Sequence, residues 1–79
     1  MLKLVKLRME LGWSQARLAR AARIDQANMS RIERGLLAPY PGQLRRLARA
    51  LSWPANAAHE LLDRVPSGRE AVAVPDDAA

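Results

Sequence analysis

The 79-residue sequence has no cysteine, no phenylalanine and only three aromatic residues. Without cysteine the chain cannot form a disulfide or a cysteine-ligated zinc site. It also lacks a signal-peptide pattern and any apolar run of about 18 residues, the length that a membrane-spanning helix needs. We therefore expect a soluble, cytoplasmic protein of one small domain that is stabilised by helix packing.

Residues typical of catalysis are equally scarce. His59 is the single histidine of the chain, and a lone histidine is an unlikely metal ligand. Nucleophilic catalysis needs a nucleophile beside a histidine and an acid, and neither Ser14 nor Ser30 has such companions in the sequence. We predict that the protein is not an enzyme and that it uses no cofactor and no metal ion.

Positive charge is concentrated in the first two thirds of the chain. Residues 1–51 carry eleven lysines and arginines against three acidic residues, a net charge of +8, whereas residues 52–79 carry −3. A basic surface is typical of a protein that binds a polyanion, although many solvated helix faces are also rich in arginine. We expect the basic part to face nucleic acid and the acidic end to point away.

Apolar residues recur at helical spacing in five segments, and no segment shows the alternation of a convincing strand. In the first segment the apolar stripe consists of Leu4, Leu7 and Leu11. The predicted helices cover about 2–11, 14–21, 25–34, 41–51 and 54–65. The pattern therefore predicts an all-α fold, a compact bundle of five helices.

The composition divides the chain into two parts. Residues 1–65 hold the helices and form the predicted domain. Residues 66–79 have few packing residues and end in VPDDAA, which predicts a flexible, disordered acidic tail. Val72 and Val74 could instead add a short strand to a partner, so the tail is also a candidate segment for binding another protein.

The helices predicted at 14–21 and 25–34 follow each other almost without a linker. Ser14 and Asp25 are suited to cap these two helices, and Gly35 is suited to end the second. Two amphipathic helices joined by so tight a turn must cross steeply, which leaves the outer face of the second helix free. Proteins use this geometry to place a helix in the major groove of double-stranded DNA.

The outer face of the helix at 25–34 is polar and basic. At roughly 100° per residue, Met29 and Ile32 mark its buried side. The residues on or beside the opposite side are Gln26, Ala27, Ser30 and Arg31. Glutamine can pair with adenine and arginine with guanine at the edges of the major groove. We predict that these four residues contact DNA bases; a solvated polar face is the alternative.

A second set of polar residues is suited to grip the DNA backbone without reading its sequence. The first N–H groups of the helix that begins at Ser14 point outward, and Gln15 adds a side-chain donor to them. The predicted phosphate contacts are Gln15, Arg17, Asn28, Arg34, Tyr40 and Gln43. Tyr40 could equally serve only to cover the loop before the fourth helix.

Arg8 lies near the inward side of the first helix, four residues after Leu4. Glu33, four residues after Met29, is also turned toward the core. Because an unpaired buried charge is very costly, we predict a structural salt bridge between Arg8 and Glu33 that orients the helix at 25–34. A solvated Arg8 is the alternative.

Several short pieces occur together between residues 4 and about 65. They are Arg8, Gly12, Ser14–Gln15, Leu18–Ala19, Ser30–Gly35, Pro39 and the apolar stripe from Leu44 to Leu51. In combination they resemble the lambda-repressor-like, Cro/Xre-type helix-turn-helix family. The resemblance implies a five-helix fold in which the second and third helices form the DNA-binding motif.

The resemblance also implies roles for individual positions. It implies base contacts at Gln26, Ala27 and Arg31, phosphate contacts at Gln15 and Arg34, and an ion pair between Arg8 and Glu33. Ala27 departs from the polar residue often found there, and Asp25 from the usual serine or threonine. These two departures put direct base reading by residue 27 and close phosphate approach at residue 25 in doubt.

These observations predict a sequence-specific DNA-binding regulator of transcription, a repressor in the Xre family that becomes nucleoid-associated on DNA. Because one module covers few base pairs, we expect a homodimer. The predicted dimer interface consists of Leu61, Leu62 and Val65. Since the family includes members that bind proteins, the alternatives are the antitoxin of a toxin–antitoxin pair and a small adaptor or RNA-binding module.

Overall fold

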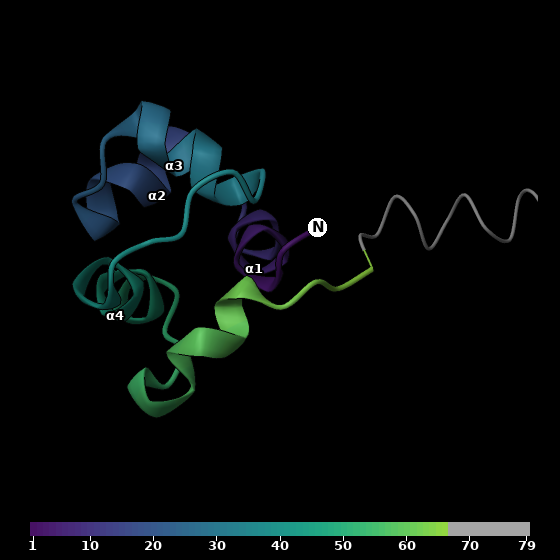
Figure 1. The fold of residues 1–79 in the computed structure, drawn as a ribbon. Helices are drawn as coiled ribbons and strands as arrows, with labels where there is room; N and C mark the ends of the chain where they lie inside the picture. The colour runs from purple at the N-terminus through teal and green to yellow at the C-terminus, as the bar shows by residue number, and fades with distance from the viewer. Residues whose placement is uncertain (67–79) are drawn as a thin grey trace, which may run out of the picture.

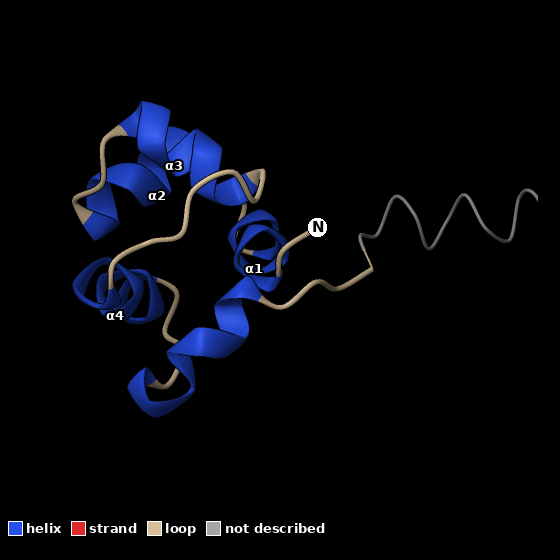
Figure 2. Cartoon of the chain, in the orientation of Figure 1, coloured by secondary structure: helices blue, strands red, loops and turns tan. Residues whose placement is uncertain are grey.

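The computed structural model describes residues 1–66 of the chain. The predicted tail, and with it Val72 and Val74, lies outside the described residues apart from Pro66. Five helical elements follow one another in the order α1, α2, α3, α4 and η1 (Figures 1 and 2). Their bounds are Lys3–Glu10, Gln15–Ala22, Gln26–Glu33, Pro41–Ala50 and Ala55–Leu62. The predicted all-α fold of five helices is confirmed.

The first four helices begin and end close to the predicted positions because their boundary residues act locally. The Ser14 hydroxyl accepts a hydrogen bond from the Arg17 N–H at 3.1 Å, and the Asp25 carboxylate accepts from the N–H groups of Ala27 and Asn28. Such side-chain caps satisfy N–H groups that have no partner within the helix.

The turn between α2 and α3 depends on one residue in the left-handed region. Arg23 has φ 57° and ψ 44°, a conformation that costs a non-glycine residue about 1 kcal/mol. The Ile24 N–H then donates to the Ala19 carbonyl at 2.9 Å, and the Ile24 side chain is buried. These contacts offset the strain and make the turn short enough for α3 to cross α2.

The fifth helix differs in type from the expected helix over about 54–65. It is a 3-10 helix with non-helical backbone at Ala57 (φ −118°, ψ 20°). The Trp53 indole N–H donates to the Ala57 carbonyl at 2.9 Å. The Trp53 indole, four residues earlier in the chain, thus supplies a partner to the carbonyl at the kink.

The core is formed by apolar side chains from every helix, and its fully buried large residues are Leu4, Leu18, Met29, Ile32, Leu47 and Leu61. The predicted stripe of α1 is wrong at one position, since Leu11 is 50% exposed. The helix ends at Glu10 and Gly12 adopts φ 72°, so Leu11 lies past the packed turns. Val5 is buried beside Leu4 instead.

Two distant segments are joined by backbone hydrogen bonds that the sequence did not predict. The Lys3 N–H donates to the Asp63 carbonyl and the Val65 N–H to the Met1 carbonyl, both at 2.8 Å. Around them Leu2 and Arg64 form an isolated antiparallel bridge. These bonds hold the segment after η1 against the start of α1.

No helix within residues 1–66 is long and apolar enough to cross a membrane.

Candidate nucleic-acid interface

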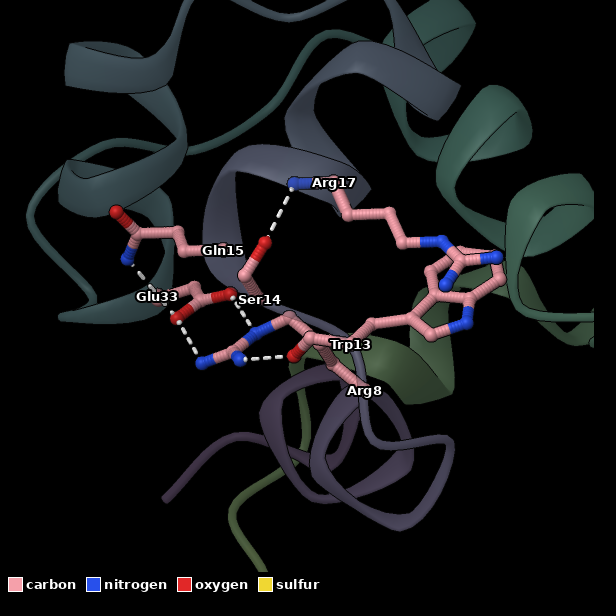
Figure 3. A network of polar contacts seen from close by, with 6 residues as sticks. All are labelled: Arg8, Trp13, Ser14, Gln15, Arg17 and Glu33. Atoms are coloured by element: carbon pink, nitrogen blue, oxygen red, sulfur yellow. Dashed lines mark hydrogen bonds and ion pairs between the residues drawn. The ribbon is translucent and has the colours of Figure 1, made fainter.

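An ion pair joins α1 to the last residue of α3 (Figure 3). Arg8 Nε lies 2.8 Å from Glu33 Oε2, and Arg8 Nη2 lies 3.0 Å from Glu33 Oε1. The two side chains are 14% and 7% exposed. This is the pair that the sequence predicts, in a bidentate geometry that fixes both the distance and the relative orientation of the two groups.

The ion pair is the centre of a wider network. Arg8 Nη1 donates to the Trp13 carbonyl at 2.8 Å, which ties the ion pair to the segment between α1 and α2. Gln15 Nε2 donates to Glu33 Oε1 at 3.1 Å. One carboxylate therefore holds α1, the start of α2 and the end of α3 together. In residues 1–66 no buried side-chain nitrogen or oxygen lacks a partner, so the network is complete.

The two predicted phosphate ligands at the start of α2, Gln15 and Arg17, are positioned by contacts with Glu33 and Trp13. The Gln15 amide already gives one donor to Glu33, but an amide NH₂ has a second N–H. The exposed Arg17 guanidinium lies 4.5 Å from the centroid of the Trp13 ring (Figure 3). Since Trp13 packs partly buried against the core, its ring restricts where Arg17 can reach.

The structure separates the two sides of α3 as the spacing predicts. Met29 and Ile32 are fully buried. The four predicted base-contacting residues lie on the other side: Gln26, Ala27 and Arg31 are exposed, and Ser30 is half-buried. This side therefore presents a short polar surface to solvent.

Two further predicted DNA ligands, Asn28 and Arg34, form hydrogen bonds with residues of this surface. Asn28, predicted as a phosphate ligand, accepts a hydrogen bond from Arg31 Nη1 at 2.9 Å, so its carbonyl oxygen orients an arginine. Arg34 Nε donates to the Ser30 carbonyl at 3.3 Å. Both arginines are thereby held close to α3.

The predicted phosphate contacts at the start of α4 also bond to each other. The Tyr40 N–H donates to Gln43 Oε1 at 2.8 Å, so the Gln43 carbonyl caps the helix. The Tyr40 side chain is 74% exposed, and its hydroxyl therefore lies at the surface. The Gln43 amide N–H groups and the Tyr40 hydroxyl are the donors that remain on this segment.

One residue of the predicted dimer interface is misassigned. Leu61 is 0% exposed and belongs to the core of the monomer, so it has no surface to offer a second copy. Leu62 and Val65 are half-buried. Ala58 and Leu61, three residues apart, both face the core where η1 packs against α1 and α4, so this side of η1 is used within the monomer.

The sequence patterns predict no role for a group of arginines on α4. Arg45 and Arg49 are exposed, and Arg46 Nε donates to the Ala22 carbonyl at the end of α2, at 2.7 Å. The signal was present as the run RRLAR, which places these charges at helical spacing off the apolar stripe. In residues 1–66 no three His, Asp or Glu side chains are grouped to hold a metal ion.

A protein-family model described as a helix-turn-helix domain matches residues 3–61 of the chain. No curated protein and no solved structure matches the sequence. The matched range begins in α1 and ends at Leu61 in η1, so it includes the whole network around Glu33 and the exposed side of α3.

Proposed function

The chain belongs to the lambda-repressor-like helix-turn-helix family, of the Cro/C1/Xre type, and we propose on this basis that it is a sequence-specific regulator of transcription. It binds double-stranded DNA by inserting α3 into the major groove, while α2 crosses the backbone. Occupation of the site excludes other proteins from it, so the protein acts as a repressor in the cytoplasm, on the nucleoid.

The observation that carries this proposal is the network around Glu33. Base recognition requires a helix held at a fixed angle with its outer side unobstructed. The bidentate pair with Arg8 and the bond from Gln15 anchor the end of α3 from within the protein. They touch only the inner side of the helix, so Gln26 and Arg31 remain exposed.

The proposed contacts divide into two kinds. Gln26 and Arg31 supply hydrogen bonds to base edges, Ala27 allows close approach, and Ser30 lies beside them. The phosphate contacts come from Gln15, Arg17, Asn28, Arg34, Tyr40 and Gln43. Phosphate contacts position the module and base contacts specify the sequence.

We further propose that the protein binds DNA as a homodimer, because one module covers too few base pairs for useful specificity. The contact surface is centred on Leu62 and Val65 rather than on Leu61. It extends to Leu36 and Leu37, which are exposed although apolar. Leu37 and Leu62 line one apolar hollow of about 190 Å³, so these two side chains share one surface.

The test begins with selection of bound duplexes from a random DNA pool. We expect a two-fold symmetric site with half-sites about 10 base pairs apart. Arg31→Ala should weaken binding to that site by roughly 1–3 kcal/mol and relax the base preference at one position, measured as Kd by competition. Lys6→Ala, at an exposed position of α1, is the control.

Two results would count against the proposal in different ways. If Arg31→Ala binds the selected site as tightly as the unchanged protein, the base-reading role of Arg31 is wrong. If selection enriches no sequence, the protein is not a sequence-specific regulator.

A further inference from the structure

Four arginines that the proposed recognition surface does not use line one groove along α4. Arg45, Arg46 and Arg49 come from α4, and Arg23 comes from the turn after α2. Two adjoining hollows, of about 310 and 260 Å³, share Arg46 and Arg49 in their walls. We call this surface the α4 groove, and its lining includes Gly42, Arg45, Arg46, Arg49, Trp53 and Arg23.

Acidic side chains do not neutralise the α4 groove within residues 1–66. The single salt bridge in that range joins Arg8 to Glu33, on α1 and α3. The side chains of Arg45 and Arg49 form no hydrogen bond to the described protein and are exposed. Clustered like charges in a groove raise the local concentration of anions, so this surface favours an anionic ligand.

Two of the guanidinium groups converge over Gly42. A Cβ atom built at Gly42 would lie 3.7 Å from Arg46 Nη1 and 3.8 Å from Arg45 Nη2. Both groups therefore reach over the same point, close enough for one phosphate to accept hydrogen bonds from both. The bond from Arg46 Nε to the Ala22 carbonyl holds one of them in place.

The extent of the α4 groove favours a nucleic-acid backbone over a single phosphate. Helical rise places Gly42 and Arg49 about 10 Å apart along α4, whereas successive phosphates of one DNA strand are about 3.4 Å apart along the duplex axis. Arg23 is three residues before Gln26, the first residue of α3. Arg23 thus connects the α4 groove to the turn that leads into α3, the helix proposed to enter the major groove.

We propose that the α4 groove binds the phosphate backbone of the same DNA, outside the segment that α3 reads. This inference rests on the proposed function, because it assumes that α3 is seated in the duplex. The α4 groove adds affinity and salt dependence without adding sequence preference, since guanidinium–phosphate contacts carry no base information. The Trp53 indole bounds the groove, but its N–H is already bonded to Ala57.

The test compares two duplexes that contain the same selected site. One covers the site alone, and the other extends it by roughly 10 base pairs of arbitrary sequence on each side, about one helical turn. The unchanged protein should bind the long duplex more tightly and with a steeper salt dependence. In Arg45→Gln/Arg49→Gln, the log–log salt slope on the long duplex should fall by about 1.8, about 0.9 for each lost phosphate contact.

The matched control is Lys6→Gln/Arg64→Gln, which removes two exposed charges outside the α4 groove. On the short duplex the two double variants should bind alike. Arg45→Lys/Arg49→Lys should keep the steep slope on the long duplex, because lysine still neutralises phosphate. Equal thermal melting of all the variants checks that none has lost its fold.

Three results would overturn the α4 groove assignment. The first is that the unchanged protein gains nothing from the longer duplex. The second is that the groove variant and its control lose the same slope on it. The third is that inorganic pyrophosphate binds tightly and saturably without DNA while duplex length has no effect, which would assign the groove to a small phosphorylated ligand. The indole N–H resonance of Trp53 reports the binding of pyrophosphate.

Random-sequence duplexes of both lengths distinguish a failure of this proposal from a failure of the proposed function. If selection enriches no site, the sequence-specific function fails, but a groove-dependent slope on the long random duplex still supports backbone binding. If selection succeeds and the slope does not depend on Arg45 and Arg49, only the α4 groove proposal fails.

Discussion

The two basic surfaces of this molecule are built differently. On the α3 side, Arg31, which we propose to read a base, is held by the side-chain oxygen of Asn28. In the α4 groove only Arg46 donates such a bond within residues 1–66, while Arg45 and Arg49 extend from an exposed helix side. Held side chains suit base edges, which demand fixed geometry, whereas unrestrained cations suit phosphates, which accept from many directions.

Removal of Glu33 should have the largest effect on stability, because Glu33 holds the end of α3 against α1 and the start of α2. Glu33→Ala leaves the Arg8 guanidinium without its counter-charge in a mostly buried position. We expect a loss of about 3 kcal/mol in the free energy of unfolding, the size seen when one partner of a buried ion pair is removed. Urea denaturation measures it.

Glu10→Ala is the control for this prediction, because Glu10 is exposed at the end of α1; its effect should stay within about 0.5 kcal/mol. Arg8→Ala/Glu33→Ala should cost less than the two single changes added together, since their contacts are shared. Strict additivity would show that the pair does not couple α1 to α3.

Within the α4 groove, Arg46 should differ from Arg49. Arg46→Ala removes a charged donor from the Ala22 carbonyl and should lower the free energy of unfolding by about 1.5 kcal/mol. Arg49→Ala, at an exposed position of the same helix, should change it by less than about 0.5 kcal/mol. Equal losses for the two variants would contradict the distinction between the held and the unrestrained arginines of this groove.

The smallest expected effect is at Asn28, which orients Arg31. Asn28→Ala should leave the fold unchanged and weaken binding to the selected DNA site by about 1 kcal/mol, the net value of one hydrogen bond. Asn28→Asp should retain the bond to Arg31 but add a negative charge that disfavours phosphate. If Asn28→Ala binds as tightly as the unchanged protein, the order of Arg31 does not contribute to recognition.

Much of the fold was accessible from the sequence because its signals are local. Capping by Ser14 and Asp25 involves atoms within three residues of each other. The inward positions of Arg8 and Glu33 follow from helical spacing and from the cost of burying a lone charge. These features therefore required no knowledge of how the helices pack.

Other features depended on contacts between segments that are distant in sequence. Gln15 was interpreted as a phosphate ligand alone, because nothing local shows that its amide lies against Glu33. The prediction that Leu61 lies on a dimer surface is wrong because η1 packs against α1, at the other end of the described chain, and this packing buries Leu61. The α4 groove was missed because Arg23 joins Arg46 only after α2 and α4 have packed.

By itself, the sequence determined the first four helices, the tight turn between α2 and α3 and the side of α3 that carries Gln26 and Arg31. These follow from periodicity, caps and charge, which act over a few residues. Only the tertiary structure decided which arginines are held and which are unrestrained. That distinction depends on the acceptor that the packing of distant helices places beside each guanidinium: Glu33 for Arg8, the Ala22 carbonyl for Arg46, and no described acceptor for Arg45 and Arg49.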